Sequence, residues 1–205
     1  MPFVLNPDLL LMAAWMTQLG GFDTTPTLDR VDRVESLVAQ MADQGEHAVH
    51  LSGEIDILRA LLAYEAAADP ENVIALAGRA LATTPRAWYY VRSIGWLYIA
   101  GAYQMVGRLD RAYAALAEGE PEDVAEDGAV RARVAASRCF IEWMAGDLQA
   151  MPQGAAHVLA VGETHHRRES LGWAHYLFSS AAYQRNDLPT AEAHARDLEG
   201  IRYLG

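Results

Sequence analysis

The chain contains no lysine, because all 16 of its basic residues are arginine. Three kinds of site depend on a lysine side chain: a P-loop that binds nucleotide phosphates, a Schiff base, and a lysine general base. The sequence therefore excludes all three within these 205 residues. The formal net charge of −11 also repels phosphate backbones, so we expect no direct contact with nucleic acid.

Cysteine, signal sequences and long apolar runs are equally scarce. Cys139 is the one cysteine, which excludes an intrachain disulfide and favours a packed core residue in a reducing compartment. No signal peptide is predicted, since the first basic residue is Arg30. The longest apolar run, residues 9–16, is too short to span a bilayer. We therefore expect a soluble, cytoplasmic chain with no membrane contact.

Strand signals are also missing. Alanine is abundant, β-branched residues are few, and no segment alternates polar and apolar residues for long, so the sequence predicts helices separated by short turns. The acidic segment 118–127 is predicted to be a solvated connection in which Asp127 caps the next helix; an acidic docking segment is the alternative.

Four predicted turns resemble one another along the chain. Their first residues are 39, 39 and 40 positions apart, and each follows an aromatic residue by three or four positions. The turns begin at Ala68, Gly107, Gly146 and Asn186, and the aromatic residues are Tyr64, Tyr103, Trp143 and Tyr183. A second helix with small or apolar residues on one face follows each turn. This regularity indicates stacked helix pairs, because one pair cannot bury its apolar faces alone.

The sequence thus predicts one all-α domain over residues 1–205, a right-handed superhelix of antiparallel helix pairs with a repeat near 40 residues. The expected N-terminal pair covers 7–44, and the repeats cover about 51–84, 87–119, 128–161 and 167–201. Such an α-solenoid has a concave groove lined by the first helix of each pair. Apolar ends that lack polar caps also suggest self-association.

The unit around residues 102–116 resembles a tetratricopeptide repeat. Its packing positions are Trp96, Ile99, Ala100, Tyr103, Ala112 and Leu116, with Gly107 in the turn. The longer period, together with segments 58–81 and 170–195, is similar to the superhelix of the MalT-like large ATP-binding regulators of the LuxR family. The resemblance covers roughly residues 8–205.

This resemblance implies a middle segment of a transcriptional regulator that senses an inducer and controls self-assembly. In that family a nucleotide-binding module precedes the superhelix and a helix-turn-helix domain follows it, and this sequence has neither motif. We therefore expect no cofactor here, with ATP implied only for a module of the parent protein. The expected partner is a small effector or a protein segment in the concave groove.

Candidate binding residues are aromatic or directional polar side chains on the first helices of the repeats. Aromatic rings can stack on ring faces, while Arg and Gln donate directed hydrogen bonds. The candidates are Arg59, Tyr98, Gln104, Arg138, Trp143, Trp173, Tyr176, Tyr183 and Gln184. Core packing is the alternative for Trp143 and Tyr183, and pairing with Glu142 is the alternative for Arg138.

No catalytic or metal motif is recognised. His165 and His166 are interpreted as surface or helix-start residues, and the same interpretation covers His175 and His194. Glu54 and Asp56 are two positions apart, which places them on different helix faces and predicts solvated acids. The sequence therefore predicts a non-enzymatic effector-sensing and interaction domain of a LuxR/MalT-type regulator. The alternative is a stand-alone tetratricopeptide scaffold that binds a protein or peptide.

Overall fold

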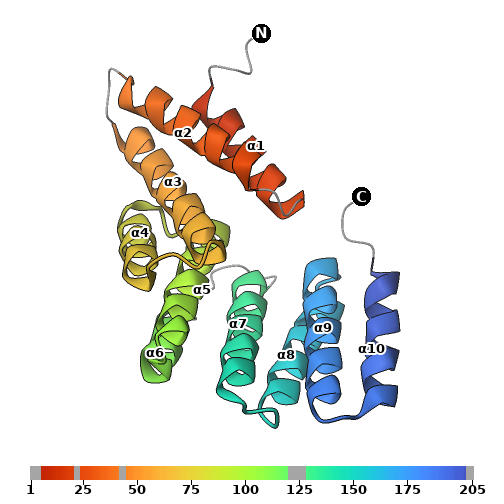
Figure 1. Ribbon diagram of the computed structural model, residues 1–205. Helices are drawn as coiled ribbons and strands as arrows, with labels where there is room; N and C mark the ends of the chain where they lie inside the picture. Colours follow the sequence, from red (N-terminus) through yellow and green to blue (C-terminus); the bar gives the residue numbers. More distant parts are fainter. Residues whose placement is uncertain (1–5, 21–23, 42–44, 120–127, 202–205) are drawn as a thin grey trace. The chain divides into compact units, whose positions relative to one another are not determined.

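The computed structural model describes residues 6–20, 24–41, 45–119 and 128–201, and these residues form ten α-helices and no strand (Figure 1). The all-α prediction is confirmed. The helices are α1 (Pro7–Gly20), α2 (Thr25–Ala39), α3 (Glu46–Glu65), α4 (Pro70–Thr83), α5 (Tyr89–Met105), α6 (Leu109–Gly119), α7 (Ala129–Ala145), α8 (Met151–Thr164), α9 (Arg168–Gln184) and α10 (Leu188–Gly200). Segment 120–127, which holds most of the acidic connection and the expected cap Asp127, lies outside the described residues.

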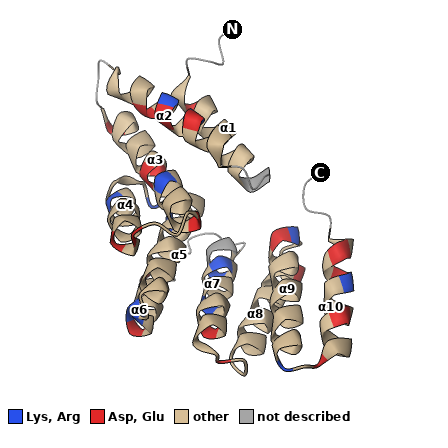
Figure 2. Ribbon diagram, in the orientation of Figure 1, with Lys and Arg blue, Asp and Glu red and all other residues tan. Residues whose placement is uncertain are grey.

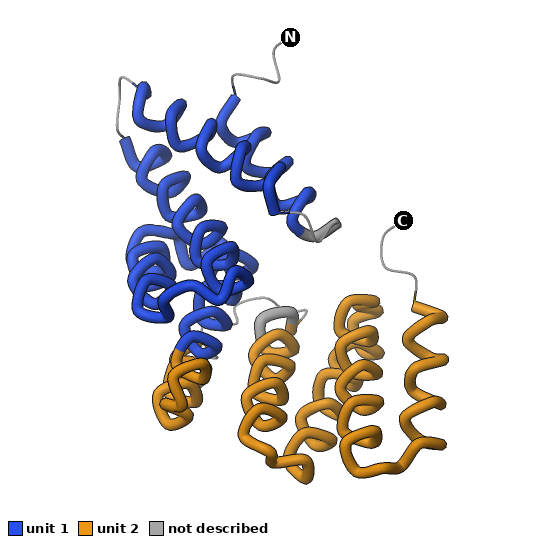
Figure 3. Tube along the Cα trace, viewed as in Figure 1, with its two compact units in different colours: residues 1–102 blue, residues 103–205 orange. Residues whose placement is uncertain are grey.

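The chain divides into two compact units, residues 1–102 and 103–205, and the boundary falls within α5 (Figure 3). In unit 1, α1 packs on α2, α2 on α3 and α3 on α4, and α1 also contacts α3. In unit 2, each helix from α6 to α10 packs on the next, and α7 also contacts α9. From α1 to α4 and from α6 to α10, helices that are neighbours in sequence are therefore neighbours in space.

The four repeated turns share one backbone geometry. One or two residues after the end of each first helix lies a left-handed residue: Ala67 (φ 50°), Gly107 (φ 73°), Gly146 (φ 80°) and Asn186 (φ 61°). In each turn the next N–H donates to the carbonyl five residues back, for example Asp147 to Glu142 at 2.9 Å and Asp187 to Ala182 at 2.9 Å. This is the Schellman arrangement that closes a helix at its C-terminus.

These left-handed residues define the repeat register and correct two alignments. They are 40, 39 and 40 residues apart, so the first turn is placed at Ala67 instead of Ala68. Three residues before them lie Tyr64, Gln104, Trp143 and Tyr183, whose carbonyls accept the second turn hydrogen bond. The aromatic residue that is out of register by one position is therefore Tyr103.

Small residues on the second helices allow the pairs to pack closely. Ala77 of α4, Ala112 of α6 and Ala155 of α8 are fully buried. The core of unit 2 consists of side chains from α7, α8 and α9 that share this burial: Ala136, Cys139, Met151, Ala155, Val158, Ala174, Leu177 and Ala181. The outer helix α10 has one buried residue, Ala191, which is 7% exposed.

Candidate functional site

A groove of about 510 Å³ lies in unit 2 along α7, α9 and α10. Its lining combines aromatic, aliphatic and small polar side chains: Trp143, Tyr176, Ser179, Ser180, Tyr183, Gln184, Leu188, Ala191, Glu192, Ala195 and Leu198. The volume falls within the range of small-molecule sites, which is roughly 300–1,000 Å³. We refer to it below as the unit 2 groove.

Helical spacing brings the groove residues of α9 to one face. Tyr176, Ser180 and Tyr183 follow one another at intervals of four and three, which places their side chains along one stripe. The Ser179 hydroxyl donates to the Ala191 carbonyl at 2.9 Å and joins α9 to α10 beside this stripe. The groove is therefore supported by two helices that are hydrogen-bonded to each other.

Four aromatic rings form a connected cluster at one side of the groove. Trp143 contacts Tyr176 with ring centroids 6.2 Å apart, and Tyr176 contacts Trp173 at 6.1 Å. Phe140 contacts all three of these rings at 5.5 to 6.3 Å. Because each ring contacts at least two others, the cluster holds Trp143 and Tyr176, its two members that line the groove, in fixed orientations.

The groove is open to solvent at its aromatic side. Tyr183 is 66% exposed and Tyr176 is 37% exposed, so both rings are accessible to a ligand. Gln184 and Ser180 offer hydrogen-bond donors and acceptors at the same surface. Among the described residues that line the groove none is an arginine, and Glu192 is paired with Arg196. This surface suits a ring-bearing ligand without an anionic group.

The structure brings five of the nine sequence candidates together. Trp143, Tyr176, Tyr183 and Gln184 line the unit 2 groove, and Trp173 belongs to the aromatic cluster beside it. Tyr183 is largely exposed, so the core-packing alternative is wrong for that residue. Trp143 is half-buried and packs on the cluster while it also lines the groove.

Arg138 has a different environment. Its guanidinium lies over the Tyr113 ring of α6, 5.7 Å from the ring centroid. This cation–π contact joins α6 to α7 within unit 2. Glu142 is half-buried, and burial raises the pKa of its carboxyl, although the Arg138 charge opposes that shift. Arg138 does not line the groove.

The candidates on the earlier helices lie outside the groove. Arg59 pairs with Asp32 at 2.8 Å and also with Glu35, so it joins α3 to α2. The Tyr98 ring packs on the Tyr64 ring with centroids 5.1 Å apart. Gln104 is half-buried near the end of α5. The Arg59 and Tyr98 contacts stabilise helix packing in unit 1.

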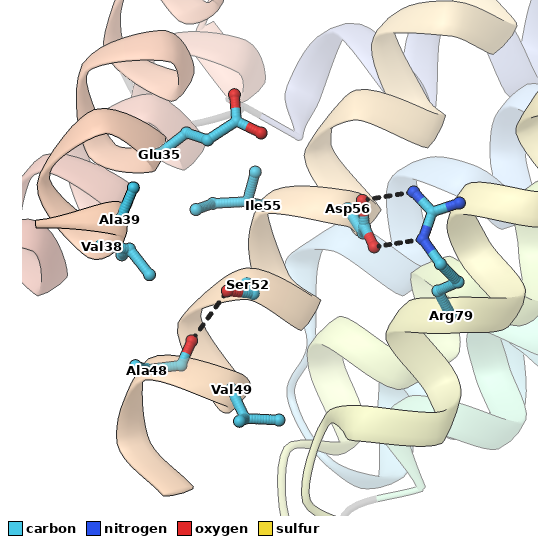
Figure 4. Close-up of a pocket in the computed structure, with 9 residues that line it drawn as sticks. All are labelled: Glu35, Val38, Ala39, Ala48, Val49, Ser52, Ile55, Asp56 and Arg79. Atoms are coloured by element: carbon cyan, nitrogen blue, oxygen red, sulfur yellow. Dashed lines mark hydrogen bonds and ion pairs between the residues drawn. The ribbon is translucent and has the colours of Figure 1, made fainter. Parts of the chain in front are cut away.

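Unit 1 has a smaller pocket of about 310 Å³ between α2, α3 and α4 (Figure 4). The view shows Asp56 facing Arg79, whose Nε and Nη2 donate to the carboxylate at 3.1 and 2.9 Å. Glu35, at the far side, accepts from Arg59. The charged side chains that line this pocket already have ion-pair partners, and most of its other lining residues are apolar. The pocket therefore offers a ligand few directed contacts.

The prediction that Glu54 and Asp56 are solvated acids is wrong for both. Asp56 is half-buried in the pair with Arg79. Glu54 accepts a hydrogen bond from Trp15 Nε1 at 2.5 Å, and burial raises the pKa of its carboxyl, opposed by that hydrogen bond. The partner of Asp56 comes from α4 and the partner of Glu54 from α1, so the spacing of the two acids within α3 does not predict either contact.

Sequence reasoning missed the contribution of α10 to the groove. Leu188, Glu192 and Leu198 come from a second helix, whereas the candidates were sought on first helices. The signal that could have found them is their spacing, since residues 188, 191, 195 and 198 follow the intervals of one helix face.

The predictions for the cysteine and for two of the histidines agree with the structure, whereas two other histidines have a different environment from the one expected. Cys139 is free and fully buried, as predicted, and burial raises the pKa of its thiol to about 12. His165 and His166 are exposed at the end of α8, so their assignment to the surface is confirmed. His175 and His194, by contrast, are half-buried and lie together with Asp197. The ligating atoms of these three side chains all lie within 4.8 Å of one another.

Among the described residues, no helix has the length and apolar character needed to cross a membrane. No protein-family model, curated protein or solved structure matches the chain.

Proposed function

We propose that the chain is a non-enzymatic module that senses a small effector, and that the unit 2 groove is the effector site. The observation that carries this proposal is the presence of solvent-exposed aromatic rings in a groove of small-molecule size. A ring-bearing, neutral or weakly cationic effector fits best, because no arginine is among the described lining residues. Gln184 and Ser180 would orient it by hydrogen bonds.

The helix pairs form a tetratricopeptide-like superhelix of a MalT-like regulator in this proposal. Support comes from the four Schellman turns at intervals of 40, 39 and 40 residues and from the packing of α7 on α9. Effector binding would then bias the parent regulator between resting and assembled states. A Walker-A motif and a helix-turn-helix domain in the same reading frame would support this parentage.

A fluorescence and thermal-shift screen tests the effector site. Trp143 lines the groove, so a bound ligand should change tryptophan emission and also raise the melting temperature. For a ligand found this way, Tyr183→Ala should weaken binding roughly 2- to 10-fold, as expected for one aromatic contact. Tyr89→Ala is the matched control, because Tyr89 is an exposed tyrosine of α5. A broad metabolite and nucleotide screen without any ligand would remove the basis for effector sensing.

A protein or peptide partner is the second candidate function. It is favoured by exposed apolar side chains at the ends of helices in unit 2, namely Met144 at 66%, Tyr183 at 66% and Leu188 at 54%. Such residues are typical of interaction surfaces. Selection from a random peptide library separates the two cases. A selected peptide that binds the wild-type protein but not Met144→Glu supports this scaffold. A small ligand that binds both proteins equally supports the sensor.

A further inference from the structure

His175, His194 and Asp197 form a cluster between the last two helices of the chain. His175 comes from α9, and His194 and Asp197 lie three residues apart on α10. His175 Nδ1 lies 3.1 Å from His194 Nδ1 and 3.5 Å from an Asp197 oxygen, which is 4.0 Å from His194 Nδ1. Two imidazole nitrogens and one carboxylate oxygen therefore converge on one point.

The separations agree with the geometry of a zinc site. Ligand atoms about 2.0–2.1 Å from a tetrahedral zinc ion are about 3.3–3.4 Å apart. Two of the three observed distances are within about 0.2 Å of this range. The third distance, between His194 Nδ1 and the Asp197 oxygen, would shorten if the Asp197 side chain rotated, and that side chain is 59% exposed. We propose that His175, His194 and Asp197 bind one Zn²⁺ ion and thereby clamp α10 onto α9.

The cluster is preorganised by its surroundings. The His194 ring stacks on the Phe178 ring with centroids 4.8 Å apart and an interplanar angle of 16°. The His175 side chain is 16% exposed and the His194 side chain 26% exposed, so packing restricts both rings. Restricted rings lose little conformational entropy when a metal binds. Phe178 thus acts as a positioning residue for His194.

The cluster also contrasts with the other histidines of the region. His165 and His166 are adjacent in sequence and exposed at the end of α8, and neither belongs to a group of converging ligands among the described residues.

Without a metal, the contact between the Nδ1 atoms of His175 and His194 is a single hydrogen bond in which one ring donates and the other accepts. Three protein ligands leave the fourth zinc position for water or an external ligand. Nitrogen ligands disfavour Mg²⁺ and Ca²⁺, which prefer oxygen.

Calorimetric titration with ZnCl2 tests the site on protein that carries no histidine tag. We expect one Zn²⁺ per chain and a higher melting temperature, whereas MgCl2 and CaCl2 should produce neither effect. His175→Gln and His194→Gln should each weaken zinc binding at least about 10- to 100-fold. Asp197→Asn provides a variant at an exposed position, which keeps the test independent of any folding defect in the histidine variants. Circular dichroism establishes that each variant is folded.

The matched control is His157→Ala, which removes an exposed histidine of α8 and should leave zinc affinity unchanged. Binding of Co²⁺ should add visible absorption bands characteristic of tetrahedral coordination, and Phe178→Ala should weaken them. Absence of zinc binding would overturn the proposal. So would binding that survives in the double variant His175→Gln/His194→Gln, because the ion would then be held elsewhere. Neither result bears on the unit 2 groove, which is tested by its own variants.

Discussion

The sulfur of Cys139 leaves no room for a side chain at Gly154. A Cβ atom built on Gly154 of α8 would lie 2.4 Å from Cys139 Sγ of α7. The thiol is fully buried and 3.6 Å from the Met151 carbonyl. This contact limits how closely α7 and α8 can approach each other.

We therefore expect Gly154→Ala to destabilise the protein by about 1–3 kcal/mol, the usual cost of overpacking. Cys139→Ala removes the sulfur, so the double variant Gly154→Ala/Cys139→Ala should lose less stability than the sum of the two single variants. Urea unfolding followed by circular dichroism measures all three values.

Gly78→Ala is the control for the helix context. Gly78 is an exposed residue of α4, and an added Cβ there meets nothing within 4 Å. Its replacement should raise stability by roughly 0.5–1 kcal/mol through helix propensity alone. Equal effects at the two glycines would contradict the proposed close approach.

The Cys139 thiol should be chemically inert in the folded protein. Burial raises its pKa to about 12, so almost no thiolate is present near neutral pH. Ellman's reagent should therefore react slowly with native protein and rapidly once denaturant unfolds it. Rapid reaction without denaturant would show that the helix pair opens readily.

The left-handed turns predict stability changes of opposite sign. Ala67 adopts φ 50°, a conformation that strains a residue with a Cβ, so Ala67→Gly should stabilise the protein by up to about 1 kcal/mol. Gly146→Ala should destabilise it by about 1 kcal/mol or more. An added Cβ at Gly146 meets nothing within 4 Å, so the loss measures backbone strain alone. Thermal and urea unfolding check both variants, and equal signs would contradict the assigned turns.

The burial of Glu54 should make the free energy of unfolding depend on pH. Burial raises the pKa of its folded-state carboxyl above 4.5, although the Trp15 hydrogen bond opposes the shift. The folded state then binds this proton more tightly than the unfolded state, so ionisation lowers stability as pH rises through that window. Glu54→Gln should therefore stabilise the protein at pH 7, since the amide oxygen still accepts from Trp15.

The advantage of Glu54→Gln should shrink as pH falls from the raised pKa toward 4.5. Glu163→Gln, at an exposed position of α8, controls for the general loss of one negative charge. Chemical unfolding at several pH values measures the difference. An advantage of equal size at every pH would show that burial does not perturb the Glu54 carboxyl.

The sequence predicted the repeated turns well because these turns carry local signals. Gly107, Gly146 and Asn186 are residue types that tolerate left-handed geometry, and their spacing alone located three of the four repeated turns. Ala67 has no such signal, so the first turn was misplaced by one residue. Similarly, Tyr176 and Tyr183 were found as candidates because the repeat register places both on a first helix, which is α9.

Contacts between helices could not be predicted in the same way. Glu54 meets Trp15 across 39 residues, and His175 meets His194 across 19, so both depend on how one helix is aligned against another. Sequence periodicity defines the face of a helix but not its axial alignment with a neighbour. The contribution of α10 to the groove was missed for a different reason, because candidates were sought on first helices only.

The shallow burial of α10 has a consequence for the end of unit 2. Because Ala191 is the one residue of α10 that is buried, separating α10 from α9 exposes less core area than separating α7 from α8, so we expect α10 to detach before the other helices of unit 2 separate. Binding of a ligand in the unit 2 groove, or of a metal ion by the histidine cluster, would stabilise the contact between α10 and α9.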